Sequence, residues 1–292
     1  MSSKKAITIV LVLLSVAVGV VALEQGSIVL NYSGMDEYVG KTLSARIVDL
    51  ATGREVERTI IPEIAEGSFT IDFGSLAAGN AYRIDFYVDM NGNGRYDQPP
   101  VDQAWQLELQ ELSDAVSLEF RPTTDYTDID WPPMIDGVIE PHEYRHSMTD
   151  PGTGMEVHWQ NDATYLYVGL VSPGTGWEAI GFDPTRKMQG ANIIIGAVSE
   201  DSLVIEDHYG ASPTSHREDK ASQILQSAGV EAEGKTVIEF VIPLASDDPN
   251  DVSLVPGTDV TVILAYHVAS DRLTARHTKR STSSIALDGG GE

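Results

Sequence analysis

Oxygen-bearing groups recur at every second position in one short acidic segment of the N-terminal half. They are four side chains and one main-chain carbonyl, from Asp89, Asn91, Asn93, Arg95 and Asp97. Ca²⁺ takes about six to eight oxygen ligands, and alternation along the chain turns such groups toward one point. The segment therefore predicts a structural calcium site. It contains no His or Cys, the ligands expected of a redox metal.

The same segment also permits a simpler interpretation. Asn91-Gly92 and Asn93-Gly94 are typical of hairpin turns, which need no metal. The spacing is similar to the start of an EF-hand or dockerin loop, but Pro100 stands where an EF-hand places its bidentate glutamate. Asp102 could replace that glutamate only at a different spacing. Calcium binding and a metal-free turn are both compatible with the sequence.

The composition excludes several other kinds of chemistry. The 292-residue chain has no cysteine, which rules out disulfides, zinc–thiolate sites, iron–sulfur clusters, thiol catalysis, c-type haem and a lipidated cysteine. Its 44 acidic and 19 basic residues give a formal net charge of -25. Because nucleic-acid binding needs a dense cationic face, we expect no nucleic-acid partner.

No catalytic constellation stands out in the sequence. Ser281, Ser283 and Ser284 lie near His277, but no Gly-x-Ser-x-Gly elbow surrounds them. The glycines at 289–291 follow no strand–helix unit, so they do not predict a phosphate-binding loop. We therefore predict that the chain is not an enzyme, although it could assist an oxidoreductase by electron transfer.

The elements that must position these residues are short β-strands in two halves. Over residues 24–121, apolar and polar residues alternate, as in Tyr82–Val88, and this period buries one face of a sheet. The pattern returns over residues 135–287, with a short helical period near Ala221–Ala228. We predict an all-β protein with two antiparallel β-sandwich domains, the first small and the second immunoglobulin-like.

Three further segments complete the predicted organisation. Residues 122–134 are rich in Thr, Asp and Pro, which predicts an interdomain linker, and residues 288–292 predict a flexible tail. Residues 1–22 have the layout of a secretory signal, with Lys4 and Lys5 before an apolar run. An uncleaved N-terminal membrane anchor is the alternative. Either way, we expect an exported chain that is extracellular, periplasmic or on the cell surface.

A series of segments in the second half is similar to one known family. The segments are Ile135–Ile139, Val157–Asp162, Tyr165–Val168, Gly176–Pro184, Met188–Gly196 and Glu206–Tyr209. Together they resemble the DOMON domain, the dopamine β-monooxygenase N-terminal-like domain, over about Ile135 to Leu287. The most specific part is Gly-Trp-x-Ala-Ile-Gly-Phe followed by Met-x-Gly-Ala-x-Ile-Ile-Ile-Gly.

The resemblance implies an immunoglobulin-like sandwich with a ligand pocket, as in the cytochrome domain of cellobiose dehydrogenase. In haem-binding members, a Met before the Ile-rich strand and a His near the C-terminus ligate the iron. The matching positions here are Met188 and His277, and Arg280 would pair with a haem propionate. Arg276 before the His, and Ser281 in place of the usual Gly, depart from the family's pattern.

Each of these residues also has a plainer interpretation. Met188 could be exposed or fill the core, and His277 could be a surface histidine. His208 could support a ligand-binding residue, but it is interpreted as a histidine at the end of a strand, and His216 is interpreted as solvent-facing. Trp177 is expected to pack in the core of the sandwich.

The resulting functional hypothesis is an extracytoplasmic b-type cytochrome that binds haem b and exchanges electrons with a redox partner protein or a membrane electron carrier. Met–His ligation fills both axial positions of the iron, which favours electron transfer over bond chemistry. The alternative is a non-redox module at the cell surface that binds a carbohydrate or another small ligand in the same pocket.

Overall fold

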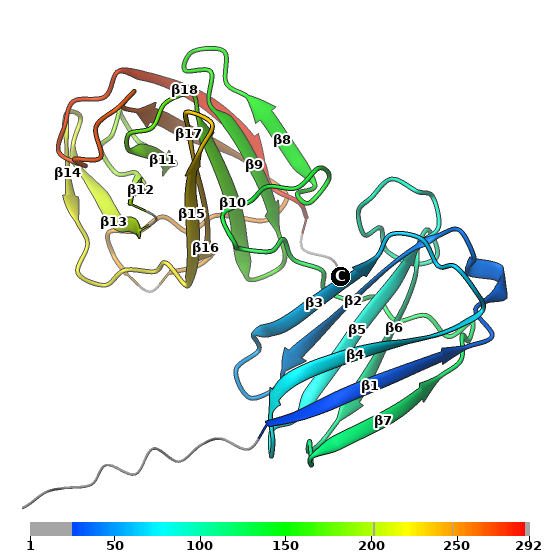
Figure 1. Ribbon diagram of the computed structural model, residues 1–292. Helices are drawn as coiled ribbons and strands as arrows, with labels where there is room; N and C mark the ends of the chain where they lie inside the picture. Colours follow the sequence, from blue (N-terminus) through cyan, green and yellow to red (C-terminus); the bar gives the residue numbers. More distant parts are fainter. Residues whose placement is uncertain (1–24, 201, 247, 290–292) are drawn as a thin grey trace, which may run out of the picture.

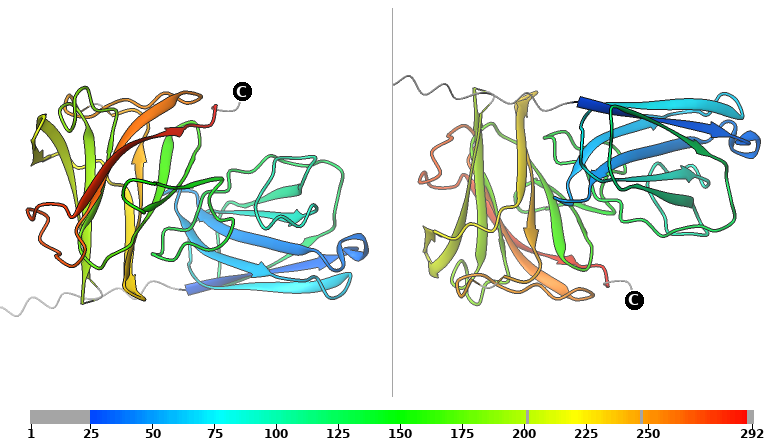
Figure 2. Two further views of the ribbon diagram at one scale, coloured as in Figure 1. Left: turned by 90° about the horizontal axis from the view of Figure 1, so that it is seen from above. Right: turned by 90° about the horizontal axis from the view of Figure 1, so that it is seen from below.

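The computed structural model describes residues 25–200, 202–246 and 248–289. The predicted signal or anchor, residues 1–22, lies outside the described residues. Within them, two domains lie side by side (Figure 1, Figure 2), and each consists of two β-sheets. The prediction of two β-sandwich domains is confirmed. The helical structure of the described part is a single 3-10 turn, Asp36–Tyr38, and no helix there is long and apolar enough to cross a membrane.

The N-terminal domain packs a three-stranded sheet, ordered β4-β1-β7, against a four-stranded sheet, ordered β3-β2-β5-β6. Neighbouring strands are antiparallel except β1 and β7, which are parallel. The strands are β1 (Gln25–Ser33), β2 (Thr42–Asp49), β3 (Glu55–Ile61), β4 (Ser68–Ala77), β5 (Tyr82–Asp89), β6 (Gln103–Leu109) and β7 (Ala115–Phe120).

Alternation along these strands places one face of each sheet in the core between the sheets. Ile28 and Leu30 of β1 point into this core and meet Ile84 and Phe86 of β5. All four side chains are fully buried. Burying an aliphatic or aromatic side chain of this size contributes about 1.5–3 kcal/mol, so the period-two pattern of the sequence selects the sandwich.

Residues 122–134, the predicted linker, lie across the outer face of the four-stranded sheet. The ring of Trp131 packs against the Arg58 guanidinium, whose central carbon is 4.6 Å from the ring centroid. Arg46 donates a hydrogen bond to the carbonyl of Asp130. The segment that leads to the second domain therefore also covers the first.

The C-terminal domain packs a five-stranded sheet, ordered β15-β16-β10-β9-β8, against a six-stranded sheet, ordered β14-β13-β12-β11-β17-β18. Its strands are β8 (His146–Thr149), β9 (Glu156–Asn161), β10 (Tyr165–Ser172), β11 (Glu178–Phe182), β12 (Asn192–Ser199), β13 (Ser202–Ser212), β14 (Ser215–Glu218), β15 (Gln226–Ala232), β16 (Lys235–Pro243), β17 (Asp259–Tyr266) and β18 (Lys279–Ala286).

The prediction of a short helix near Ala221–Ala228 is wrong. Strand β15 begins at Gln226 and pairs antiparallel with β16, with Gly229 opposite Ile238. Helix propensity is a weak local preference, and the backbone hydrogen bonds that β16 offers override it.

Candidate functional site

The middle strands of the six-stranded sheet are apolar on both faces. In β12, Ile194 points into the core of the sandwich, whereas Ile193 and Ile195 point outward into a separate apolar cluster. Ala179 of β11 belongs to the same outer cluster. A sheet with one face in water carries polar residues at alternate positions. These strands instead form an apolar floor that requires a cover.

A cavity of about 700 Å³ lies over this floor. The cavity is bounded below by this floor. Its sides are formed by the loop between β11 and β12, the β13–β14 hairpin and the segment between β17 and β18. The cavity is lined by Met188, His277 and Arg280, among others. The three residues predicted to hold a haem thus line one cavity, and their roles as ligands stay predictions.

Met188 reaches the cavity from the end of the sheet where β11 leads into β12. The loop folds back over the sheet, and the Gly190 N–H donates to the carbonyl of Gly210 in β13 at 2.9 Å. Any Cβ at position 210 would collide with the main-chain carbonyl of Met188. The missing side chain of Gly210 is therefore what allows Met188 to lie over the floor.

His277 and Arg280 reach the cavity from the opposite end of the sheet. Strand β17 ends at Tyr266, which pairs with Glu178 at the start of β11. The following segment returns over the floor, where Leu273 packs against the outer cluster. The two ends are one length of β11 apart, roughly 13 Å at the usual rise per residue. This span suits a flat ligand that is held from two sides.

The surroundings of His277 keep its imidazole neutral. Burial lowers the pKa of His277, and the charges of Arg280 and Arg276 lower it further. A neutral imidazole has the free lone pair that a metal ion needs. The two arginines also give this part of the cavity positive charge, which suits an anionic group on a ligand.

Trp177 is one of the residues that line the cavity. Its side chain is buried, as expected, but it packs with Ala179 and Ile195 in the outer cluster rather than in the core between the two sheets. The Nε1 of Trp177 is buried and has no partner among the described residues.

Residues 151–267, which include the cavity floor and Met188, match the family model described as the DOMON domain. The C-terminal domain is a DOMON domain. DBH-like monooxygenase protein 1 from Mus musculus is 31% identical over 125 residues, which cover 42% of this chain and 20% of that protein. The Homo sapiens protein of the same name is 28% identical over 109 residues, which cover 37% of this chain and 18% of that protein. The chain thus spans about a fifth of the length of these relatives.

Two solved structures are similar to the DOMON domain. The cytochrome b domain of pyranose dehydrogenase from Coprinopsis cinerea has a TM-score of 0.40 and 11% identity, covering 48% of this chain and 80% of that one. The cytochrome domain of Myriococcum thermophilum cellobiose dehydrogenase has a TM-score of 0.37 and 11% identity. This match covers 49% of this chain and 88% of that one.

A chain of hydrogen bonds in the DOMON domain was missed by the sequence interpretation. In β13, His208 Nε2 lies 2.8 Å from Glu206 Oε2, and His208 Nδ1 lies 2.9 Å from Nδ1 of His216 in β14. His216 is half-buried and lines the cavity. His208 lies within β13 and is 8% exposed, so it is not the strand-end residue that was expected. The turn Ser212–Ser215 was the signal for the hairpin that joins them.

The acidic loop of the N-terminal domain closes on itself through hydrogen bonds. The carboxylate of Asp89 accepts from the N–H groups of Gly92 at 2.7 Å and Gly94 at 2.8 Å. The carboxylate of Asp102, which is fully buried, accepts from the N–H groups of Met90 at 2.9 Å and Asp97 at 2.8 Å. Asp102 therefore belongs to the loop despite its spacing.

The remaining predicted metal ligands lie in the same loop. Asn91 donates its amide to Asp97 at 2.9 Å, and Asn93 donates to the same carboxylate. The half-exposed side chain of Arg95 also lies beside this carboxylate, with its Nε 3.7 Å from Asp97 Oδ1. Burial raises the pKa of Asp102, and the nearby charge of Asp89 adds to this effect. Among the described residues, no group of three or more His, Cys, Asp or Glu is arranged to hold a metal ion. Calcium binding stays a prediction.

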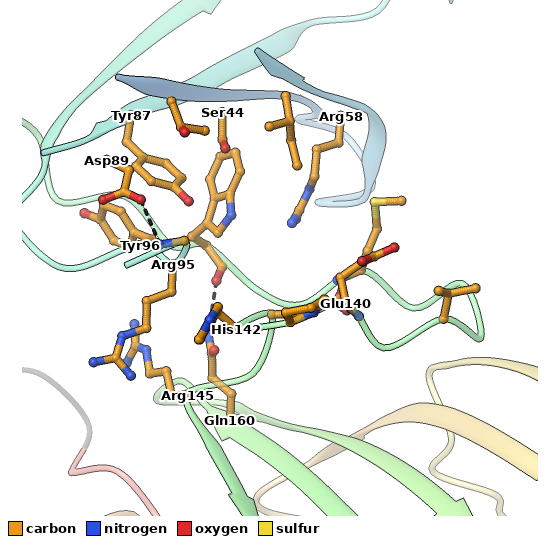
Figure 3. A pocket seen from close by; sticks show the side chains of 18 of the residues that line it. Ser44, Arg58, Tyr87, Asp89, Arg95, Tyr96, Glu140, His142, Arg145 and Gln160 are labelled. Atoms are coloured by element: carbon orange, nitrogen blue, oxygen red, sulfur yellow. Dashed lines mark hydrogen bonds between the residues drawn. The ribbon is translucent and has the colours of Figure 1, made fainter. Parts of the chain in front are cut away.

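A second cavity of about 210 Å³ lies between the two domains (Figure 3). Gly94 of the acidic loop forms one side, and His142 of the C-terminal domain packs against it. Gln160 of β9 donates to the carbonyl of Trp131 at 3.0 Å. The acidic loop and the covering segment thus both contact the DOMON domain.

Proposed function

We propose that the DOMON domain binds a b-type haem non-covalently and transfers electrons through it. The observation that carries this proposal is the cavity of about 700 Å³, into which Met188 and His277 reach from opposite ends of the sheet. A thioether and a neutral imidazole are suitable axial ligands for haem iron. Since the chain has no cysteine, the attachment would be non-covalent.

The other lining residues fit a porphyrin. Ile193, Ile195 and Ala179 offer an apolar floor for the ring. Arg280 would pair with a propionate, because a cation offsets the charge of a carboxylate.

A bound haem would supply reversible one-electron transfer. Met188 and His277 would hold the iron through a thioether and an imidazole. A thioether ligand raises the reduction potential, so Met188 would favour the reduced state. The chain would hold and shield the group rather than act on a substrate, and we therefore propose an electron-transfer accessory without catalysis of its own.

A titration of the purified chain with haem tests the proposal. We expect a Soret band, with sharp α and β bands after reduction. His277→Ala should weaken haem binding at least tenfold, and Met188→Ala should remove the charge-transfer band of a Met–Fe(III) bond. His142→Ala and Met134→Ala change matched residues outside the haem cavity and should have no effect. A colourless protein that binds an oligosaccharide would instead support carbohydrate binding.

We also propose that the protein works outside the cytoplasmic membrane, with a redox partner protein or a membrane electron carrier. The support for export is Lys4 and Lys5 before an apolar run. Mass spectrometry of the N-terminus after expression with and without residues 1–22 would test this. Full retention of the intact chain in the cytoplasm would contradict export.

We further propose a structural role for Ca²⁺ in the acidic loop. The support is the gathering of Asp89, Asp97 and Asp102 beside Asn91 and Asn93, all of which carry oxygen ligands of the kind that Ca²⁺ prefers. The ion would hold the loop that forms one side of the interdomain cavity.

A further inference from the structure

We propose that His216 is an alternative axial ligand of the iron in the DOMON cavity and can take the position of Met188. The inference rests on the proposed haem function and adds a third ligand to the same site. Its support is the hydrogen-bond chain that holds His216 and the place of His216 in the cavity wall.

With a neutral His208 ring, the hydrogen-bond chain defines which ring nitrogen of His216 carries the proton. A carboxylate can only accept, so His208 donates from Nε2 to Glu206 at 2.8 Å. In a neutral His208, Nδ1 is then an acceptor, and His216 donates to it from its own Nδ1 at 2.9 Å. The proton of His216 is thereby placed on Nδ1, and its Nε2 keeps a free lone pair. Metal-binding histidines commonly use their second ring nitrogen in this way.

Glu206, His208 and His216 are hydrogen-bonded in series and do not converge on one point as the ligands of a metal ion would. Both nitrogens of His208 are occupied, one by Glu206 and the other by His216. They therefore cannot share a metal ion among themselves. Glu206 and His208 are positioning residues, and the group left to bind something is His216.

His216 and Met188 approach the cavity from the same end of the sheet. Gly210 of β13 lies against the main chain of Met188, and the turn after Ser212 leads directly into β14, which carries His216. His277 comes from the opposite end of the strands. Two ligands at one end and one at the other would place His216 in competition with Met188, opposite His277.

The environment of His216 suits iron binding. Burial lowers the pKa of His216. Replacement of the thioether by a second imidazole would lower the reduction potential, because Met ligation is what raises it.

The experiment compares the spin state of haem in variants of the full chain. In Met188→Ala, we expect the iron to stay six-coordinate and low-spin, with the electron paramagnetic resonance signature of two imidazole ligands. In the double variant Met188→Ala/His216→Ala, we expect high-spin iron and at least tenfold weaker haem binding. Met188→Ala/Thr214→Ala, which changes another residue of the cavity wall, should keep the low-spin spectrum.

Variants of the positioning residues supply a second readout. Glu206→Gln in the Met188→Ala background removes the charge that orients His208, and we expect roughly tenfold weaker binding, in the range typical of lost support for a metal-binding histidine. Glu206→Gln in the otherwise wild-type chain should leave the low-spin spectrum unchanged, because Met188 is present there to hold the iron.

The outcomes separate this inference from the proposed function. If the wild-type chain binds haem but Met188→Ala is high-spin or loses haem, His216 is not an alternative ligand. The inference about His216 is then wrong, while the proposed haem function stands. A low-spin double variant Met188→Ala/His216→Ala would overturn that inference too, since another group would be the ligand. If the wild-type chain binds no haem, both proposals are wrong.

Discussion

The two sandwiches differ most in the outer face of one sheet. In the N-terminal domain, that face is polar, with Arg46 paired to the fully buried Asp85 at 2.9 Å, and residues 122–134 cover it. In the DOMON domain, the corresponding outer face is apolar, and its cover of loops leaves a cavity of about 700 Å³. The chain thus covers the outer face of one sheet closely and leaves a cavity over the outer face of the other.

The buried carboxylates show the same contrast. Asp85 accepts hydrogen bonds from Arg46, Arg83 and Gln106. Glu178 in β11 is fully buried, and neither of its oxygens has a partner among the described residues. Burial raises the pKa of Glu178 well above its ordinary value. The N-terminal domain therefore buries a carboxylate that is paired with arginine, whereas the DOMON domain buries a carboxyl group without a cation beside it, for which burial favours the protonated form.

The largest effect on stability is expected from the ion pair of the N-terminal domain. Arg46→Ala leaves Asp85 buried with less compensation, which should cost about 3–5 kcal/mol of unfolding free energy. Urea-induced unfolding measures this loss. Arg95→Ala, whose side chain is 45% exposed, is the control and should cost less than about 1 kcal/mol. Equal losses in the two variants would show that covering the sheet does not depend on Arg46.

A smaller loss of stability is expected from the loop that covers the open face. Gly210→Ala forces the Met188 carbonyl away from β13, which should cost about 1–3 kcal/mol and weaken haem binding. Thermal unfolding and haem titration measure the two effects. Gly74→Ala in β4 adds a methyl group where no atom lies within 4 Å, and neither quantity should change. Unchanged haem binding in Gly210→Ala would contradict the role of this glycine.

The buried acid predicts a stability that depends on pH. Below the unfolded pKa of about 4.5, Glu178 is protonated in both states and has no effect. As the pH rises above that value, the unfolded chain loses the proton that the folded domain keeps, so stability falls. Glu178→Gln should flatten this dependence and raise the free energy of unfolding at pH 7 relative to pH 4.

Thermal unfolding between about pH 4 and pH 8 tests the effect of Glu178→Gln. The control is Glu111→Gln, an exposed residue of the N-terminal domain. It should leave the pH dependence of the wild-type chain intact. A gain that is equal at pH 4 and pH 7 would argue against titration of Glu178.

The smallest effect concerns Ca²⁺ in the acidic loop. Addition of about 1 mM Ca²⁺ should stabilise the folded chain by about 1 kcal/mol, a rise of a few degrees in Tm. Asp89→Ala should abolish the rise, whereas Asp125→Ala, at an exposed position, should preserve it. No rise in the wild-type chain would favour the metal-free turn.

The sequence was sufficient to predict the features that depend on local pattern. Alternating residues predicted the two sandwiches, and the segments Gly176–Pro184 and Met188–Gly196 indicated the DOMON domain. Met188, His277 and Arg280 all line one cavity, as the resemblance implied. These successes share one cause, because each depends on which face of a strand a residue occupies or on a contiguous motif.

The missed features depend on contacts between segments that are separate in the sequence. His216 meets His208 only because a four-residue turn pairs β13 with β14. The role of residues 122–134 as a cover depends on the packing of Trp131 against Arg58, which composition does not reveal. Strand β15 depends on its partner β16. In each case, tertiary pairing decided the structure.

The covering segment also decides where the N-terminal domain ends as a folding unit. A fragment that stopped at residue 121 would keep every strand of that domain yet expose the buried face around Arg46. A fragment of residues 25–134 would keep the face closed. Because Gln160 of the DOMON domain donates to the carbonyl of Trp131, unfolding of either domain would remove contacts of residues 122–134 with that domain. The two domains are therefore expected to unfold in one cooperative transition rather than in two independent ones.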